Sequence, residues 1–154
     1  MEAITLAPIG VVAGGRDEPF DDDWNTEQAV IRLDGTRFGP GALAGLDAFS
    51  HLEVVYHFHR VDPAEINTTA RRPRGNPDWP EVGIFAQRGR NRPNLLGVSR
   101  CRLLSVDGLD VHVHGLDAID GTPVLDIKPY MAEFGPQGET EQPRWATELM
   151  RNYY

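Results

Sequence analysis

Short apolar stretches separated by turn-forming residues recur along the whole chain. Valine, isoleucine, leucine and aromatic residues come in short runs between Gly, Pro, Asp and Asn, and the periodicity of long amphipathic helices is largely missing. This pattern predicts a mostly β protein. The expected strands are Ile4–Val12, Gln28–Leu33, His51–Arg60, Val82–Phe85, Gly97–Val106, Leu109–Gly115 and Val124–Ile127.

Two turn signals divide the second half of this pattern. Asp107-Gly108 lies between two alternating apolar segments, and it can supply the positive φ that a tight two-residue hairpin requires. Asp120-Gly121-Thr122-Pro123 directly precedes the strand-like residues 124–127. We therefore expect a hairpin at the first signal and a turn into the last strand at the second.

One short helix is expected within residues 143–154. Pro143 lies near its start, and Trp145, Leu149 and Tyr153 fall along one face. We expect this face to pack on the rest of the domain or on a partner subunit.

Two segments, Gly14–Asn25 and Asp62–Pro80, are too long and too interrupted by Gly and Pro to be hairpin turns. Long loops on a rigid scaffold often carry binding residues. Solvated, flexible loops are the alternative interpretation.

The composition is that of a single globular domain, which we expect to cover residues 1–154. The chain is 40% apolar and 25% charged, and it has no apolar run long enough to cross a bilayer. Its start, MEAITLAPIGVV, lacks the pattern of a secretory signal. We expect no membrane association and a cytoplasmic location.

The charge is distributed unevenly along the chain. The net charge is -8, yet the segment from Arg71 to Arg102 holds eight arginines against two acidic residues, a local balance of +6. The remainder carries a balance of -14. A focused cationic site on an acidic body describes this asymmetry better than a general polyanion-binding surface does.

Metal-ligating residues are few. Cys101 is the only cysteine, which excludes an internal disulfide and a cysteine zinc site, so we interpret it as a small buried apolar residue. His57 and His59 share a strand face, as do His112 and His114, but such pairs more often mark a half-polar face than a metal site. We predict no metal, and we interpret His59, beside a long loop, as a residue that orients a ligand.

The arginines of the segment RGRNRPN have a spacing suited to anion binding. Arg88, Arg90 and Arg92 alternate and point the same way if the segment is extended, and each guanidinium can bind a carboxylate or phosphate through two parallel hydrogen bonds. A nucleotide, a nucleic acid or an amino-acid carboxylate would suit such a row, and a solvated edge is the alternative. Pro93 and Asn94 then form a rigid turn with polar groups.

The segment DGTPVLDIKPY has a second concentration of polar residues. Asp126 and Lys128 alternate on one strand face, and Tyr130 follows Pro129 where the strand ends. An acid and a lysine in this arrangement fit a solvated or cross-paired face as well as they fit a site. Their spacing leaves both interpretations open.

Two sequence blocks resemble a known family. The common nucleotide-binding, metalloprotease and serine-hydrolase signatures are absent. The segment GIFAQRGRNRPNLLGVS, within residues 81–99, is similar to the GVFATRSxxRPNPIGxS block of the TrmO/TsaA-like family. The segment DAIDGTPVLDIKPY, residues 117–130, resembles that family's DxxDGTPVxDIKPY block. PIGVV near the start and GLDAFSHLEVVYHFH match the family too, in the same order.

The resemblance implies a fold and an activity. Members of this family are S-adenosylmethionine-dependent methyltransferases built on a small antiparallel β-barrel, and they form homodimers with the cofactor near the subunit interface. The implied reaction is N-methylation of threonylcarbamoyladenosine beside the tRNA anticodon.

The resemblance also assigns residues, motif by motif. The implied catalytic residues are Asp126, Lys128 and Tyr130. Arg90, Arg100 and Arg102 are candidates for binding nucleic-acid phosphates. The implied cofactor-binding residues are His59, Arg88, Arg92, Pro93, Asn94, Gly97, Asp120, Gly121, Thr122 and Pro123.

These assignments are coherent with methyl transfer. Holding donor and acceptor in line can supply up to about 7–11 kcal/mol of the barrier. Arg88 or Arg92 is expected to bind the carboxylate of the cofactor or of the modified base. Asp126 is expected to bind the cofactor's ammonium or ribose, and Lys128 or Tyr130 to position or deprotonate the accepting nitrogen.

The sequence departs from the family pattern at several positions. Gln87-Arg88-Gly89 replaces Thr-Arg-Ser, Leu95-Leu96 replaces Pro-Ile, and only Gln28 remains of a Pro-Arg-Gln segment. We also expect no second, carboxy-terminal domain of the kind many bacterial relatives have. Two alternatives therefore stay open beside the tRNA enzyme. One is a methyltransferase with a small-molecule acceptor, and the other is a non-catalytic module that binds S-adenosylmethionine.

Overall fold

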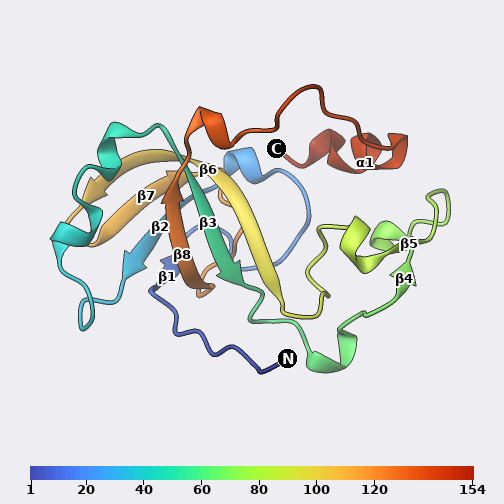
Figure 1. The fold of residues 1–154 in the computed structure, drawn as a ribbon, viewed down its shortest axis with the longest axis horizontal. Helices are drawn as coiled ribbons and strands as arrows, with labels where there is room; N and C mark the ends of the chain where they lie inside the picture. Colours follow the sequence, from blue (N-terminus) through green and yellow to red (C-terminus); the bar gives the residue numbers. More distant parts are fainter.

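Six antiparallel strands close into a small barrel in the computed structural model, which describes all 154 residues (Figure 1). Neighbouring strands pair in the order β1, β2, β7, β6, β3, β8. Their bounds are Gly10–Ala13 (β1), Gln28–Leu33 (β2), His51–His57 (β3), Leu96–Asp107 (β6), Asp110–His114 (β7) and Pro123–Pro129 (β8). The antiparallel barrel that the family resemblance implied is confirmed.

Two further elements lie outside the barrel, on the same side of it in Figure 1. One is a two-stranded sheet of β4, Ala70–Arg71, and β5, Val82–Gly83. The other is the helix α1, Arg144–Leu149, which continues into a 3₁₀ turn at Met150–Asn152. The predicted C-terminal helix is thus confirmed, with Pro143 directly before its first residue. No helix has the length and apolar content needed to cross a membrane.

The strand predictions fail mainly at their ends. The first strand was expected from Ile4 but begins at Gly10, because the preceding residues are mostly exposed. The third ends at His57, where the chain turns. Of Val82–Phe85 only the first two residues pair, and a 3₁₀ turn at Ile84–Ala86 buries Ile84 instead.

The predicted hairpin joins β6 and β7, but its turn lies one residue later than expected. Asp107 and Asp110 are the last paired residues of the ladder, so Gly108 and Leu109 form the loop. Gly108 alone has a positive φ, of 61°. Glycine at the first loop position is what a type II′ turn requires.

The core forms from the inward positions of the alternating strands. In β3, Leu52, Val54 and Tyr56 are 0–2% exposed, and Cys101 of the neighbouring β6 is 2% exposed. Cys101 is therefore the buried apolar residue that its isolation in the sequence suggested. Burial raises the pKa of its thiol to about 12. The same alternation turns Arg100 outward.

The two long loops are ordered and contact each other. Arg16 organises residues 14–25, since its guanidinium bonds the carbonyls of Phe20 and Asp22 and lies 4.0 Å from the Trp24 ring centroid. Arg74, in the second loop, pairs with Asp22 at 2.8 Å. Both segments are therefore held by specific side-chain contacts.

Gly97 in β6 is required by a close approach. It pairs with Tyr56 of β3, and a Cβ at this position would overlap the Tyr56 ring. We predict that Gly97→Ala destabilises the fold by about 1–3 kcal/mol through overpacking. The drop in thermal midpoint should be measured against Gly39→Ala, where a Cβ meets nothing within 4 Å. Equal midpoints for the two variants would contradict the prediction.

Candidate functional site

A cavity of about 1390 Å³ lies beside the barrel, where β3 ends, β6 begins and the loop before β8 passes. Tyr56 and Phe58 form one wall, and residues 85–94 form a second. The C-terminal segment closes a third side with Trp145, Leu149 and Tyr153. The predicted face of the helix therefore packs over this cavity.

Most of the residues assigned from the RPN block line this cavity. Arg88 donates to the carbonyl of Val98 at 2.7 Å, and Arg92 donates to the carbonyl of Gln87 at 2.9 Å. Neither forms an ion pair with a carboxylate. The assigned residues that the cavity brings together are His59, Arg88, Arg90, Arg92, Pro93, Asn94, Gly97 and Thr122.

His59 contributes a mostly neutral imidazole to the site. Burial lowers its pKa, and the positive charge of Arg60 and the proximity of His57 lower it further. The neighbouring turn is close, since a Cβ on Gly121 would lie 3.7 Å from the Nε2 atom of His59. No group of three or more His, Cys, Asp or Glu side chains is placed to share a metal ion.

The other residues of the predicted turn have structural roles. The carboxylate of Asp120 accepts a hydrogen bond from the backbone N–H of Gly14 at 2.8 Å, and Gly121 has a φ of 80°. Pro123 pairs with Val11. Asp120, Gly121 and Pro123 hold the turn against β1 and do not line the cavity.

Asp126, Lys128 and Tyr130 also lie away from the cavity of their own chain. The carboxylate of Asp126 pairs with the Lys128 ammonium at 2.7 Å, and both side chains are about half exposed or more. Tyr130 lies under the guanidinium of Arg100, 4.7 Å from its ring centroid. Within one chain these three residues do not form the opposite wall of the Arg88 pocket, because β8 and the residue after it turn them to the outside of the barrel. Their role as catalytic residues stays a prediction.

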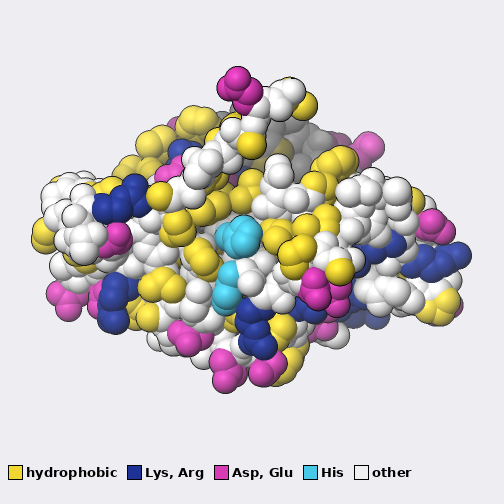
Figure 2. Space-filling view, turned by 90° about the horizontal axis from the view of Figure 1, so that it is seen from below, with side chains coloured by type: hydrophobic (Ala, Val, Ile, Leu, Met, Phe, Trp, Pro, Cys, Tyr) yellow, Lys and Arg dark blue, Asp and Glu magenta, His cyan; other side chains and the backbone are white.

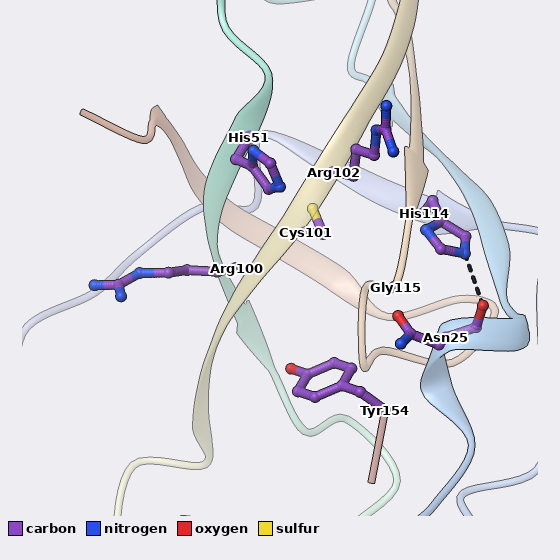
Figure 3. Close-up of a pocket in the computed structure, with 8 residues that line it drawn as sticks. All are labelled: Asn25, His51, Arg100, Cys101, Arg102, His114, Gly115 and Tyr154. Carbon is purple, nitrogen blue, oxygen red and sulfur yellow. Dashed lines mark hydrogen bonds between the residues drawn. The ribbon is translucent and has the colours of Figure 1, made fainter. Parts of the chain in front are cut away.

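The proposed phosphate-binding arginines are divided among different surroundings. Arg100 is neutralised by Glu53, at 2.8 Å, and Arg90 donates to the carbonyl of Pro19 at 3.1 Å. Arg100 and Arg102, two positions apart on the outward face of β6, both line a separate pocket of about 380 Å³ with His51 and His114 (Figure 3). In Figure 3 the side chain of Arg100 extends away from this group. Arg90, at the large cavity, is therefore separate from Arg100 and Arg102.

One polar cluster at the cavity was not anticipated. Asp117 accepts hydrogen bonds from the hydroxyl of Tyr56, at 2.9 Å to its carbonyl oxygen, and from the hydroxyl of Tyr153 to its carboxylate. Burial and the charge of Asp117 raise the pKa of both phenols. The helix pattern includes Tyr153, but its partner Asp117 lies 36 positions earlier in the sequence. No local sequence pattern predicts that the two residues are in contact.

The charge asymmetry of the sequence persists in space. The cavity is lined by six arginines against three carboxylate side chains. Basic side chains gather at the end of the molecule that carries β4 and β5 (Figure 2). The cavity suits a ligand with at least one anionic group.

Comparison with family models and named proteins gives consistent matches. A model of the tRNA-methyltransferase O N-terminal domain matches residues 16–135. A tRNA (adenine(37)-N6)-methyltransferase of Mus musculus is 40% identical over 93 residues, which is 60% of this chain and 21% of the relative. A probable S-adenosyl-L-methionine-binding protein of Methanothermobacter thermautotrophicus is 35% identical over 139 residues, 88% of this chain and 96% of the relative.

The fold is also similar to solved structures. The crystal structure of TrmO from Pseudomonas aeruginosa has a TM-score of 0.73 and 26% sequence identity, covering 91% of this chain and 62% of that one. The chain spans only about a fifth to a quarter of the mammalian relatives it matches.

The raised pKa of Tyr153 predicts that the stability of the fold depends on pH. Its raised pKa means that, above about pH 10, the unfolded chain releases the phenolic proton while the folded chain keeps it, so stability falls as the pH rises. We expect Tyr153→Phe to cost about 1–2 kcal/mol at pH 8 and to flatten the decline above pH 10. Urea unfolding at pH 8, 10 and 11 measures both effects, and an unchanged slope would contradict the assignment.

Proposed function

The chain belongs to the tRNA-methyltransferase O N-terminal domain family, and from this premise we propose that it transfers a methyl group from S-adenosylmethionine to N6 of an adenosine in tRNA. The finer proposal is that this adenosine carries the threonylcarbamoyl group and lies beside the anticodon. The observation that carries the proposal is the cavity whose arginines Arg88 and Arg92 are free of ion pairs.

The chemistry of this cavity fits the cofactor. When bound, S-adenosylmethionine supplies an electrophilic methyl group on a sulfonium. Arg88 and Arg92 each use one N–H on a backbone carbonyl and keep others for the carboxylate of a ligand. Phe58 and Phe85 offer aromatic faces, and Asp117 and Glu65 offer carboxylates near an ammonium.

The residues of the chain act by binding and orientation. The carbonyl bonds of Arg88 and Arg92 fix their guanidinium planes before a ligand arrives, which lowers the entropic cost of positioning it. His59 has a lowered pKa, so it can accept a hydrogen bond without adding positive charge near a cation. Trp145, Leu149 and Tyr153 restrict water on the side that the C-terminal segment closes.

A second subunit can bring Asp126, Lys128 and Tyr130 to the site. They face outward on β8, so they can reach a cavity of this kind only in another copy of the chain. We therefore propose a homodimer in which the outer face of β8 contributes to the partner's site. Exposed Met131 and Phe134, directly after β8, support an apolar contact there.

A small-molecule acceptor remains the second candidate. The observation that favours it is that Glu53 neutralises Arg100 and that Arg90 lies at the large cavity, apart from Arg100 and Arg102. A long RNA would be expected to need a continuous basic track. The net charge of -8 points the same way.

Labelling with methyl-labelled S-adenosylmethionine distinguishes the two acceptors. Incubated with total tRNA and, separately, with small metabolites, the protein is expected to label tRNA. Activity should fall steeply with salt, because neutralised phosphates release counterions. Arg88→Ala and Arg92→Ala should each lose about tenfold or more, the loss expected for a charged hydrogen-bond partner. Label confined to the metabolite pool would favour the second candidate.

Mixing inactive variants tests the shared site. Arg88→Ala alters the cavity, and Tyr130→Phe with Lys128→Ala alters the outer face of β8. If each site combines the two surfaces from different subunits, random reassociation is expected to restore about a quarter of wild-type activity. Sedimentation of the unmixed protein gives the oligomeric state. A dimer without recovery would place Lys128 and Tyr130 outside the site.

A further inference from the structure

Arg71 carries the only buried side-chain polar atom in the protein without a hydrogen-bond partner, its Nε. The residue belongs to β4 and lines the large cavity with Arg88 and Arg92. Its guanidinium forms no ion pair and donates no hydrogen bond within the chain. A buried N–H of a charged group left unpaired costs about 1–3 kcal/mol or more, so the position calls for a partner that the protein itself does not supply.

The backbone around Arg71 is fixed by a buried glutamine. The side-chain amide of Gln87, which is 8% exposed, donates to the carbonyl of Arg71 at 3.0 Å and to that of Val82 at 2.8 Å. The carbonyl of the same Gln87 accepts from Arg92. One residue therefore sets the positions of Arg71 and Arg92 relative to each other.

Space for the Arg71 guanidinium comes from Gly89. A Cβ at this position would lie 2.9 Å from the Nη2 atom of Arg71, so the end of this flexible side chain would have to shift. Positions 87 and 89 are the two at which the sequence replaces the Thr and Ser of the family block by Gln and Gly. Both departures serve the same side chain, one by holding its backbone and the other by leaving room for its charged end.

The cavity is large enough for a second ligand group beside a cofactor. At about 1390 Å³ it exceeds the roughly 300–1,000 Å³ usual for one small-molecule ligand. None of the three carboxylates that line the cavity pairs with Arg71, since Asp21 pairs with Arg74, Asp117 accepts from Tyr153 and Glu65 accepts from Asn91. Arg71 thus presents a free positive charge in a partly enclosed site.

We propose that Arg71 binds an anionic oxygen group, a carboxylate or a phosphate, on the methyl acceptor and so selects acceptors that carry one. Nε and one Nη of a guanidinium form a fork that matches two oxygens of such a group. The inference rests on the proposed methyl transfer, and it assigns Arg71 to the acceptor while Arg88 and Arg92 remain with the cofactor. On a threonylcarbamoyladenosine the group is the threonine carboxylate, and on an RNA chain it is a backbone phosphate.

Binding measurements test the assignment without catalysis. Protein saturated with S-adenosylhomocysteine is titrated with threonylcarbamoyladenosine nucleoside and with its methyl ester, in which the carboxylate is neutral. Wild type is expected to bind the acid about tenfold or more tightly than the ester, and Arg71→Gln to lose this preference. Arg71→Lys keeps the charge without the fork and should recover part of it. Arg151→Gln, an exposed arginine outside the cavity, should behave as wild type.

The source of the anion follows from a second comparison. If Arg71→Gln leaves nucleoside binding unchanged but raises the KM for tRNA about tenfold with little change in kcat, the group is a phosphate. Affinity for S-adenosylhomocysteine alone is expected to stay within about twofold of wild type in every variant, since a carboxylate held by Arg71 would cost far more. A loss of that affinity in Arg71→Gln would assign Arg71 to the cofactor and overturn the proposal, and so would the absence of any change.

Failure of the proposed function has a different signature. If wild type labels a metabolite and not tRNA, the tRNA function is wrong. The charge of the labelled compound then tests whether Arg71 binds an anionic group on the acceptor. Retention of that compound on an anion exchanger, with labelling lost in Arg71→Gln, supports the inference. A labelled acceptor without an anionic group overturns it. Wild type that labels nothing and binds neither nucleoside nor tRNA overturns both proposals.

Discussion

The carboxylate and carbonyl of Asp117 join the parts of the molecule that form the site. Tyr56, from the centre of β3, and Tyr153, from the C-terminal segment, both donate to this residue. Tyr56 in turn stacks over Gly97, which sets the approach of β6. The barrel, the loop before β8 and the cover of the cavity thus meet at one residue. Because this point is mostly buried, leaving any of its polar groups unpaired would be costly, which favours a single arrangement.

The C-terminal segment is held at more than this one point. The backbone N–H groups of Asp23 and Trp24 donate to the carbonyls of Asn152 and Tyr153 at 2.9 Å each. The indole of Trp79 donates to Glu148 at 2.9 Å. The two long loops and the helix α1 are therefore one connected wall. This explains why loops with so many Gly and Pro residues are ordered: their polar groups are satisfied by each other and by the end of the chain.

The sequence predicted the barrel better than it predicted the site. Alternation identified β2 with its observed bounds and β3, β6, β7 and β8 within a few residues, because inward positions such as Val54 and Cys101 must be apolar. The motif blocks predicted Arg88, Arg92 and Asn94 as site residues, and these line the cavity. The blocks did not indicate whether Asp126 and Lys128 face the inside or the outside of the barrel. A motif records which residues occur together, whereas the curvature of a closed barrel decides which side they face.

The free arginines of the cavity follow from how the acidic residues are used. The chain has 23 acidic residues against 15 basic ones, so every arginine could have found a carboxylate. Around the cavity these carboxylates serve structural contacts instead. Asp21 pairs with Arg74, and Asp117 accepts from Tyr153. Such pairs order the loops and at the same time remove the competitors that would neutralise Arg71, Arg88 and Arg92. An acidic protein can in this way keep a local site for anions, because at short range the few unpaired charges outweigh the screened field of the rest.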